Sequence, residues 1–317
     1  MELKKDIWRP FLVHAPMDRV LAHGSLDAFA WTALPPLRRL AYEADPFGLW
    51  RDGRLHVFVE AFDYRDAHGR IDCHEFDAAM THVRSRRVLR EPWHLSYPVV
   101  FEADGETWML PEACASGHLT LYRARSFPDD WVAQATIVLD AVPIDATPVH
   151  WRGKWWLFYA PAGTPSERLT HLHAAWADTL DGPWTPHPAN PVFVDSLGAR
   201  PGGTAFVHGD AVVLPVQDCR RSYGSGLRML TITVPQGGPA STDLGGPLSI
   251  ASGPLWVPPP QAQPYQEGLH TMSAAGPVTL VDAKFRRLSL GGVLMRPRRE
   301  LRRLLRKPTG IGESDGS

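Results

Sequence analysis

Residues 43–60 read EADPFGLWRDGRLHVFVE, and three later stretches repeat their plan. These stretches are LSYPVVFEADGETWMLPE at 95–112, IDATPVHWRGKWWLFYA at 144–160 and ARPGGTAFVHGDAVVLPVQD at 199–218. Each has a proline near its start, continues as an apolar strand, turns at a glycine and enters a second strand. The turn glycines are 52, 48 and 56 residues apart: Gly53, Gly105, Gly153 and Gly209. A period near 50 residues with about four strands per unit is typical of β-propeller blades.

A fifth, weaker unit begins near Leu269 and includes residues 279–282. We expect a strand from the N-terminal segment, around residues 7–13, to complete it, since propellers commonly join their two ends in this way. The sequence therefore predicts an all-β protein with a five-bladed β-propeller over residues 1–290. A basic, partly disordered tail follows at 291–317. A β-sandwich with accidental internal similarity is the alternative fold.

The composition is that of a globular protein. Of the 317 residues, 44% are hydrophobic and 21% are charged, and no apolar run reaches the roughly 20 residues that a spanning helix needs. Asp6 and Arg9 interrupt the apolar core that a signal peptide would require. The three cysteines predict neither a disulfide framework nor a zinc site and suit a reducing compartment. We therefore expect a cytoplasmic protein.

Positive charge is concentrated near the C-terminus. From Arg286 to Lys307 there are nine basic residues and one acid, which leaves a formal charge of −9 for the rest of a chain whose net charge is −1. Leu301, Leu304 and Leu305 recur at helical spacing among arginines. Residues 296–307, from Arg296 to Lys307, therefore predict weak contact with an anionic membrane surface, peripheral to its inner face. A solvated tail, or one docked on the acidic body, is the alternative, and we expect no nucleic-acid partner.

The repeat also predicts where ionisable side chains gather. The innermost strand of each propeller blade lines the central channel, so the first residues of these strands converge on one mouth. These residues are Asp45, Tyr97, Asp145, Arg200 and His270. Glu60 and Glu112, near the ends of the second strands, are expected close by. A purely structural role does not require so many ionisable groups at repeat-equivalent positions.

Several ordered motifs carry a family resemblance. They are ADPF at 44–47, SYP at 96–98, WMLPE at 108–112, LTLYRA at 119–124 and DATP at 145–148. Residues 40–275 resemble the N-terminal domain of plant glucosamine inositolphosphorylceramide transferase and its stand-alone bacterial relatives. The plant enzymes carry a separate C-terminal glycosyltransferase domain for which this chain has no room, so their activity is not carried over.

A more distant similarity links the chain to five-bladed arabinanases, xylosidases and fructosidases. In those enzymes an early Asp-Pro carries the general base, and Asp45-Pro46 stands at that place. Asp145 matches a second carboxylate on the third blade. Arg200 and the residues after it, Pro201-Gly202-Gly203, stand where the resemblance implies the general acid. This departure argues against ordinary hydrolysis.

Glycoside chemistry needs two carboxyl groups that flank the anomeric carbon. We expect Asp45 to act as the base, with Glu112 as its first candidate partner, Glu267 as the second, and Asp145 completing the catalytic set. Candidate substrate-binding residues are Glu60, Asp63, Tyr97, Arg200, Asp218, Tyr223, Glu267 and His270. Each has a structural alternative, such as a turn cap for Asp45 or a buried ion pair between Asp145 and Arg200. The histidine spacing predicts no metal site, and we expect no cofactor.

Three classes of function remain open. An enzyme acting on a sugar or sugar-phosphate in glycan or glycolipid biosynthesis is favoured, with glycosyl transfer preferred to hydrolysis by analogy with the family. A non-catalytic glycan-binding or scaffold propeller is the alternative, because the expected blade-four acid is missing. A protein-interaction propeller is disfavoured, since interaction surfaces are usually depleted in Asp and Glu.

Overall fold

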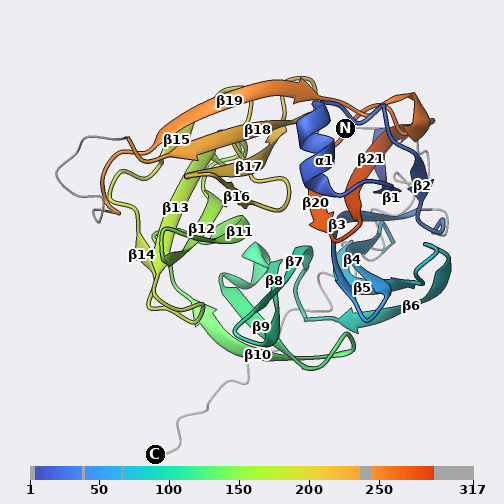
Figure 1. Cartoon of the computed structure of the whole chain (residues 1–317), viewed down its shortest axis with the longest axis horizontal. Helices are drawn as coiled ribbons and strands as arrows, with labels where there is room; N and C mark the ends of the chain where they lie inside the picture. The colour runs from blue at the N-terminus through green and yellow to red at the C-terminus, as the bar shows by residue number, and fades with distance from the viewer. Residues whose placement is uncertain (1–3, 38–39, 66, 236–243, 289–317) are drawn as a thin grey trace, which may run out of the picture.

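The computed structural model describes residues 4–37, 40–65, 67–235 and 244–288, which form five antiparallel sheets around a central axis (Figure 1). Each sheet is one blade, so the prediction of an all-β, five-bladed propeller is confirmed. The predicted tail at 291–317 lies outside the described residues. No helix in the described part of the chain is long and apolar enough to cross a membrane.

Blades I to III follow one another along the chain. Blade I contains β3 (Ala41–Arg51), β4 (Arg54–Asp63), β5 (His68–Phe76) and β6 (His82–Leu89). Blade II contains β7 (Ser96–Ala103), β8 (Glu106–Glu112), β9 (Leu119–Ser126) and β10 (Asp130–Ile137). Blade III contains β11 (Pro143–Trp151), β12 (Lys154–Pro161), β13 (His171–Ala177) and β14 (Thr185–Pro186), with β15 (Phe193–Val194) also paired to β13.

The two ends of the chain meet in the last blade. Blade IV contains β16 (Phe206–His208), β17 (Ala211–Asp218), β18 (Gly226–Thr233) and β19 (Ser249–Trp256). Blade V joins β20 (Met272–Ala275) and β21 (Val278–Leu288) to β1 (Lys4–Val13) and β2 (Trp31–Ala33). Short helices lie at α1 (Met17–His23), α2 (Glu167–Thr170), Cys114–Ser116 and Pro260–Ala262. Strand β1 pairs with β21 along its whole length, which confirms the predicted closure by the N-terminal segment.

Tight turns at the predicted glycines join the first two strands of the blades. In blades I and II both turn residues have positive φ: Asp52 and Gly53 at 52° and 72°, Asp104 and Gly105 at 53° and 76°. This is the conformation of a type I′ turn, whose twist matches that of the flanking strands. Arg152 and Gly153 repeat it in blade III. The turns lie at the opposite ends of the strands from the channel residues described below.

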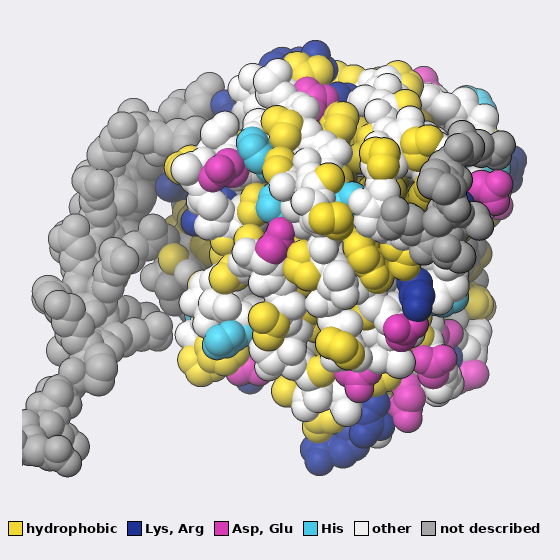
Figure 2. All heavy atoms as spheres, turned by 90° about the vertical axis from the view of Figure 1, so that its left-hand side faces the viewer, with side chains coloured by type: hydrophobic (Ala, Val, Ile, Leu, Met, Phe, Trp, Pro, Cys, Tyr) yellow, Lys and Arg dark blue, Asp and Glu magenta, His cyan; other side chains and the backbone are white. Residues whose placement is uncertain are grey.

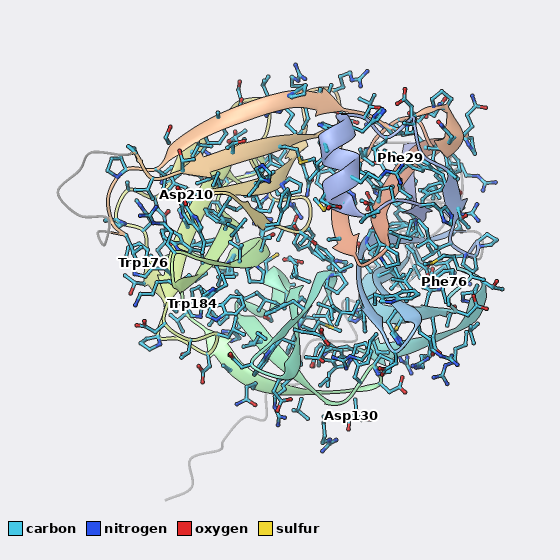
Figure 3. The ribbon with its side chains drawn as sticks, in the orientation of Figure 1. Phe29, Phe76, Asp130, Trp176, Trp184 and Asp210 are labelled. Atoms are coloured by element: carbon cyan, nitrogen blue, oxygen red, sulfur yellow. The ribbon has the colours of Figure 1, made fainter. Side chains whose placement is uncertain are left out.

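The core is divided into five hydrophobic clusters, one in each wedge between neighbouring blades. Val99 of blade II and Leu157 of blade III, for example, share one cluster, which Trp184 extends toward the rim (Figure 3). On the outer face at the left of Figure 1, hydrophobic side chains are interspersed with polar ones (Figure 2). Apolar packing thus fills the wedges, whereas the channel holds polar groups.

Candidate active site

Three blades begin with the same unusual backbone. Asp45, Tyr97 and Asp145 have φ values of 50°, 44° and 51°, in the left-handed region that residues other than glycine seldom adopt. A register shift follows each of them in the pairing with the second strand. Bulges of this kind re-aim side chains and concentrate beside functional sites, and left-handed residues cost about 1–3 kcal/mol each. The repeat therefore turns three side chains into the channel at an energetic cost.

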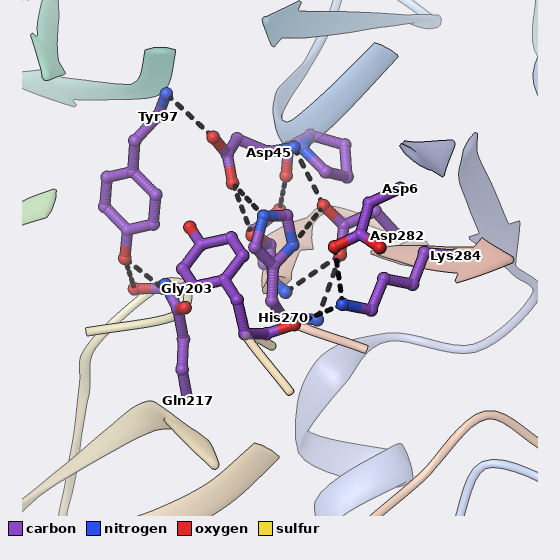
Figure 4. A network of polar contacts seen from close by, with 12 residues as sticks. Asp6, Asp45, Tyr97, Gly203, Gln217, His270, Asp282 and Lys284 are labelled. Carbon is purple, nitrogen blue, oxygen red and sulfur yellow. Dashed lines mark hydrogen bonds and ion pairs between the residues drawn. The ribbon is translucent and has the colours of Figure 1, made fainter. Parts of the chain in front are cut away.

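Asp45 lies at the junction of blades I, II and V (Figure 4). Its Oδ2 accepts a hydrogen bond from Tyr97 N at 3.2 Å, and its Oδ1 accepts one from Thr271 Oγ1 at 2.8 Å. The backbone N–H of Asp45 donates to Asp282 Oδ2 at 2.9 Å. Burial raises the pKa of Asp45, and neighbouring His270 opposes that rise. The carboxylate is thus fixed in place and is a stronger base than an ordinary aspartate.

His270 lies between two carboxylates. Its Nδ1 is 2.7 Å from Asp282 Oδ2, and its Nε2 is 3.4 Å from Asp45 Oδ1. Burial alone would lower the pKa of His270, but Asp282 and Asp45 outweigh it and raise that pKa. Trp8 stacks on the imidazole with ring centroids 3.7 Å apart. This environment favours an imidazolium that neutralises part of the buried negative charge.

Tyr97 joins blade II to blades III and IV. Its hydroxyl lies 2.9 Å from Thr147 Oγ1, accepts a hydrogen bond from Gly203 N at 2.6 Å and donates to Gly203 O at 3.1 Å. Gly203 has a φ of 147°, and a Cβ there would stand 1.8 Å from Met272 O. The Pro-Gly-Gly stretch of blade IV is therefore needed for close backbone packing at the channel.

Asp145 and Arg200 form a bidentate ion pair. Arg200 Nε and Nη2 donate to Asp145 Oδ2 and Oδ1 at 2.5 and 3.1 Å, and Gln217 Nε2 adds a third bond at 3.1 Å. Burial raises the pKa of Asp145 to about 6, although Arg200 opposes the rise. Neither bond from Arg200 uses its Nη1. The guanidinium also lies over the ring of Tyr223, 5.4 Å from its centroid.

The five predicted channel residues are thus brought together. Asp45 bonds to Tyr97 and contacts His270, Tyr97 reaches Asp145 through Thr147, and Arg200 pairs with Asp145. Tyr223 links Arg200 to His270, since its ring lies under the guanidinium and packs edge-on against the imidazole with centroids 5.4 Å apart. The charge of Asp45 also raises the pKa of Asp145.

The second strands add another level of side chains. The closing pairs of the five hairpins are Arg51↔Arg54, Ala103↔Glu106, Trp151↔Lys154, His208↔Ala211 and Ala275↔Val278. Six residues after each closing pair lie Glu60, Glu112, Ala160, Gln217 and Lys284, all buried. Counting seven residues from the turn glycine, which gives Glu60, Glu112 and Ala160, would place Val216 at this level of blade IV. The observed register places Gln217 there instead.

The two glutamates at this level have different surroundings. Glu112 Oε1 accepts a hydrogen bond from Cys114 N at 2.7 Å, and Oε2 accepts one from Ser96 Oγ at 2.9 Å. Glu60 Oε1 is buried and accepts no hydrogen bond from any described residue. His94 Nε2 lies 3.4 Å from that oxygen. Burial raises the pKa of Glu60 well above its ordinary range, and Asp45 and Glu112 raise it further.

Three other predicted site residues have partners elsewhere. Asp63 is held by Arg65 in the same hairpin, and Asp218 is buried against Arg228 and Ser225 within blade IV. Glu267 is exposed and accepts a hydrogen bond from the backbone of Arg286. Glu112 thus lies at the buried level of the second strands, whereas Glu267 is exposed to solvent. The thiol of Cys114 also lies near the mouth, but burial raises its pKa to about 12, which excludes a thiolate nucleophile at neutral pH.

Sequence reasoning missed four residues of the channel: Trp8, Gln217, Asp282 and Lys284. Asp282 and Lys284 alternate in the apolar strand β21, and charged residues inside a buried strand are the signal that could have revealed them. Lys284 Nζ donates to Asp6 Oδ2 at 2.8 Å and to the carbonyl of Tyr223.

Asp45, His270 and Asp282 offer ligand atoms within 4.8 Å of one another, a spacing that a metal ion could use. Their existing contacts suit a proton better. Both oxygens of Asp282 accept N–H groups from the protein, and Asp45 Oδ1 accepts the hydroxyl of Thr271. A cation here would have to displace these donors, whereas a protonated His270 adds to them.

The described chain also has hollows outside the channel. A groove of about 690 Å³ lies on the turn face between blades I and II and is lined by Arg51, Arg54, His56, Arg84 and Phe127, among others. A cavity of about 140 Å³ borders the N-terminal strand, with Trp8 and Tyr42 in its wall. The groove also contains Asp52 and Glu75, but Glu75 is bound by three arginines, so the channel is the better candidate for catalysis.

Comparisons with known proteins agree with this architecture. Residues 38–237 match the family described as glucosamine inositolphosphorylceramide transferase 1, N-terminal. The chain is 33% identical over 195 residues to glucosamine inositolphosphorylceramide transferase 1 of Oryza sativa subsp. indica, an alignment that covers 60% of this chain and 26% of that protein. The Arabidopsis thaliana protein is 34% identical over 195 residues, with 25% of its length covered. The chain thus spans about a quarter of the length of these relatives.

Solved structures share the fold at low sequence identity. A family 117 glycoside hydrolase of the marine bacterium Zobellia galactanivorans superposes with a TM-score of 0.54 at 13% identity, covering 80% of this chain and 86% of that one. The catalytic domain of a GH62 α-L-arabinofuranosidase of Coprinopsis cinerea gives 0.54 at 12% identity, covering 79% and 93%. With the family match extending over more than half of its length, the chain belongs to the family of glucosamine inositolphosphorylceramide transferase 1, N-terminal.

Proposed function

We propose that this chain binds a sugar or sugar-phosphate at the channel mouth and acts on its glycosidic bond. The observation that carries the proposal is the convergence of Asp45, Tyr97 and Asp145, each held in a strained left-handed conformation, on one polar mouth. Strain of this kind persists where the surrounding structure fixes a functional geometry. The names of the structural neighbours, a glycoside hydrolase and an arabinofuranosidase, support the same class of substrate.

Asp45 is proposed as the general base. Its carboxylate is fixed by donors from two other blades, and its raised pKa suits proton abstraction near neutral pH. Arg200, with Nη1 left over from its pair with Asp145, is proposed to bind an anionic or hydroxyl-rich part of the substrate. Trp8 and Tyr223 pack against the imidazole of His270 and so fix its position in the site.

Glycosyl transfer to an acceptor is favoured over hydrolysis, by analogy with the family that the chain belongs to. We place this activity in the cytoplasm, where the basic tail would contact an anionic membrane surface. We also propose that the chain is a stand-alone bacterial relative of the plant proteins. A non-catalytic glycan-binding propeller is the second candidate. It is favoured by one observation: Arg200, held by Asp145, stands at the place where related propellers are expected to carry their acid.

The test combines binding with turnover. Thermal-shift screening against aryl glycosides, sugar phosphates and nucleotide sugars should identify a ligand, and chromatographic analysis with candidate acceptors should detect a product. Asp45→Asn should bind that ligand yet turn it over about 10²–10⁴-fold more slowly, the usual contribution of a general base. Normal turnover by Asp45→Asn would refute the assignment of the base. Binding without turnover by the natural sequence would favour the glycan-binding alternative.

A further inference from the structure

We propose that Glu60 is the proton donor of this site, and that the bond it helps to cleave is an O-glycoside with an alcohol leaving group. The inference rests on the proposed function, which it deepens. The expected position in blade IV lacks an acid. Glu60 would supply it from strand β4 of blade I. An acid at Glu60 also narrows the substrate class, because leaving groups differ in their need for a proton.

Five carboxyl groups surround the channel: Asp45, Glu60, Glu112, Asp145 and Asp282. Four of them use both oxygens as hydrogen-bond acceptors within the described chain. Glu60 alone has a buried oxygen, Oε1, that accepts no hydrogen bond from a described residue, although its side chain is only 7% exposed. An ionised carboxylate needs such bonds when it is buried, whereas a carboxylic acid needs fewer and can donate one.

The charge balance of the channel agrees with a protonated Glu60. Two cations face the five carboxyl groups directly, Arg200 paired with Asp145 and His270 between Asp45 and Asp282. Lys284 is paired with Asp6 and so offsets a different carboxylate. Some of the five groups must therefore hold protons at neutral pH. The group least stabilised as an anion holds its proton most tightly, and that group is Glu60.

The titratable neighbours of Glu60 act in the same direction. Burial raises its pKa most, and the carboxylates of Asp45, Glu112 and Asp145 raise it further. His94, whose Nε2 is 3.4 Å away, would oppose the rise if it were charged. Burial lowers the pKa of His94, so the imidazole is mainly neutral at pH 7 and the opposition is small.

The fold places Glu60 beside the proposed base. Ala44 pairs with Glu60 across the β3–β4 ladder, and Asp45 follows Ala44 in the chain. Neighbouring residues of a regular strand point to opposite faces of the sheet. The left-handed conformation of Asp45 and the bulge after it break this alternation, and the charge of Asp45 acts on Glu60.

The proposed step is a single displacement. The proton of the Glu60 carboxyl group passes to the glycosidic oxygen as the bond between that oxygen and the anomeric carbon breaks, and the oxygen keeps the electron pair of that bond. An acceptor hydroxyl forms the new bond to the anomeric carbon and gives its proton to Asp45. Each turnover leaves Glu60 ionised and Asp45 protonated, and proton exchange with water restores both groups.

The leaving group determines whether Glu60 is needed. An alkoxide is a strong base, so an alcohol leaves only when a proton is delivered to it in the transition state. Fluoride and nitrophenolate leave as stable anions and need little help. The variant to test is Glu60→Gln, which keeps the shape but carries no acidic proton. Its matched control is Glu106→Gln, an exposed glutamate at the turn end of β8.

The kinetic experiment compares paired substrates of one sugar, an alkyl glycoside and the glycosyl fluoride. Glu60→Gln should lose about 10²–10⁴-fold in kcat/KM on the alkyl glycoside and less than about 10-fold on the fluoride. Glu106→Gln should match the natural sequence on both. Equal losses on both substrates, or no loss on either, would overturn the assignment of Glu60. Absence of turnover by the natural sequence on every glycoside would overturn the proposed function together with this inference.

A second measurement needs no substrate and separates these failures. Infrared spectra near pH 7 should contain the carbonyl band of a buried protonated carboxyl group. The band should be missing from Glu60→Gln and present in Glu112→Gln, because each oxygen of Glu112 already accepts a hydrogen bond, whereas Oε1 of Glu60 accepts none from a described residue. A band that survives in Glu60→Gln would overturn the assignment of Glu60, even if the channel proves to be an active site.

Discussion

Replacement of Arg200 by methionine tests the ion pair at the centre of the channel. Asp145 is 2% exposed and the side chain of Arg200 is 16% exposed, so both charges are largely removed from water. Arg200→Met would leave Asp145 with the single bond from Gln217 Nε2 at 3.1 Å. Removing one partner of a buried pair costs about 3–5 kcal/mol, because the remaining charge is uncompensated. At an unfolding entropy of about 2.1 cal/mol/K per residue, we expect the melting temperature of this 317-residue chain to fall by about 4–8 °C.

The loss should depend on pH. Burial raises the pKa of Asp145 to about 6 even with Arg200 present, and removal of the arginine should raise it further. When the pKa of a group is higher in the folded state than in the unfolded state, the group destabilises the fold less in its protonated form. The variant should therefore be closest to the natural sequence near pH 5, and the difference should grow as the pH rises through the folded pKa.

Urea unfolding, followed by tryptophan fluorescence between pH 5 and 8, provides the assay. Arg220→Met is the matched control, since Arg220 is exposed and its partner Asp218 keeps Arg228 and Ser225, and its stability should stay close to that of the natural sequence. The double variant Asp145→Asn/Arg200→Met should recover part of the lost stability. Equal stability of Arg200→Met and Arg220→Met, or no recovery in the double variant, would refute the reasoning.

Three further changes test other parts of the account. Tyr97→Phe removes the hydroxyl that bonds to Gly203 N, so the free energy of unfolding should fall by about 1–3 kcal/mol in calorimetry, and an unchanged value would contradict the observed contacts. The pKa of His270 is raised in the folded state, so its stabilisation is complete below the unfolded value of about 6.5 and disappears as pH rises through the folded pKa. Chemical denaturation should therefore show the destabilisation of His270→Gln shrinking above pH 6.5, and a constant difference would contradict the proposed imidazolium. Truncation after Leu294 should abolish salt-sensitive co-sedimentation with anionic vesicles, and equal binding by both chains, or no binding at low salt, would remove the membrane proposal.

The fold was predictable because it depends on a local signal that recurs. Gly53, Gly105 and Gly153 each occupy the second position of a two-residue turn, so their spacing sets the strands in register. In blade IV the glycine, Gly209, is the first turn residue instead. That shift of one position is why the spacing places Val216, and not Gln217, at the channel level.

The site was predictable only in part. Asp45 and Asp145 share a repeat position with Tyr97, and that position alone brings them to one mouth. The difference between Glu60 and Glu112 depends on donors such as Ser96, whose approach is a matter of three-dimensional packing. Pairwise spacing in the sequence carries no information about such contacts. The sequence alone therefore favours Glu112, and not Glu60, as the general acid.

Asp282 illustrates the same limit over a longer distance. It lies 237 residues from Asp45, yet it accepts the backbone N–H of Asp45 and contacts the imidazole of His270. Only the closure of blade V by both ends of the chain brings these groups together. No local pattern around Asp282 indicates this contact, apart from a charge inside a buried strand.

The position of a bound sugar tests the central claim most directly. A crystal structure of Asp45→Asn, soaked with the ligand found by thermal-shift screening, should place a sugar ring at the channel mouth, with polar contacts to Glu60 and Arg200. A ring bound instead in the groove lined by Arg51 and His56, with an empty channel, would contradict the account.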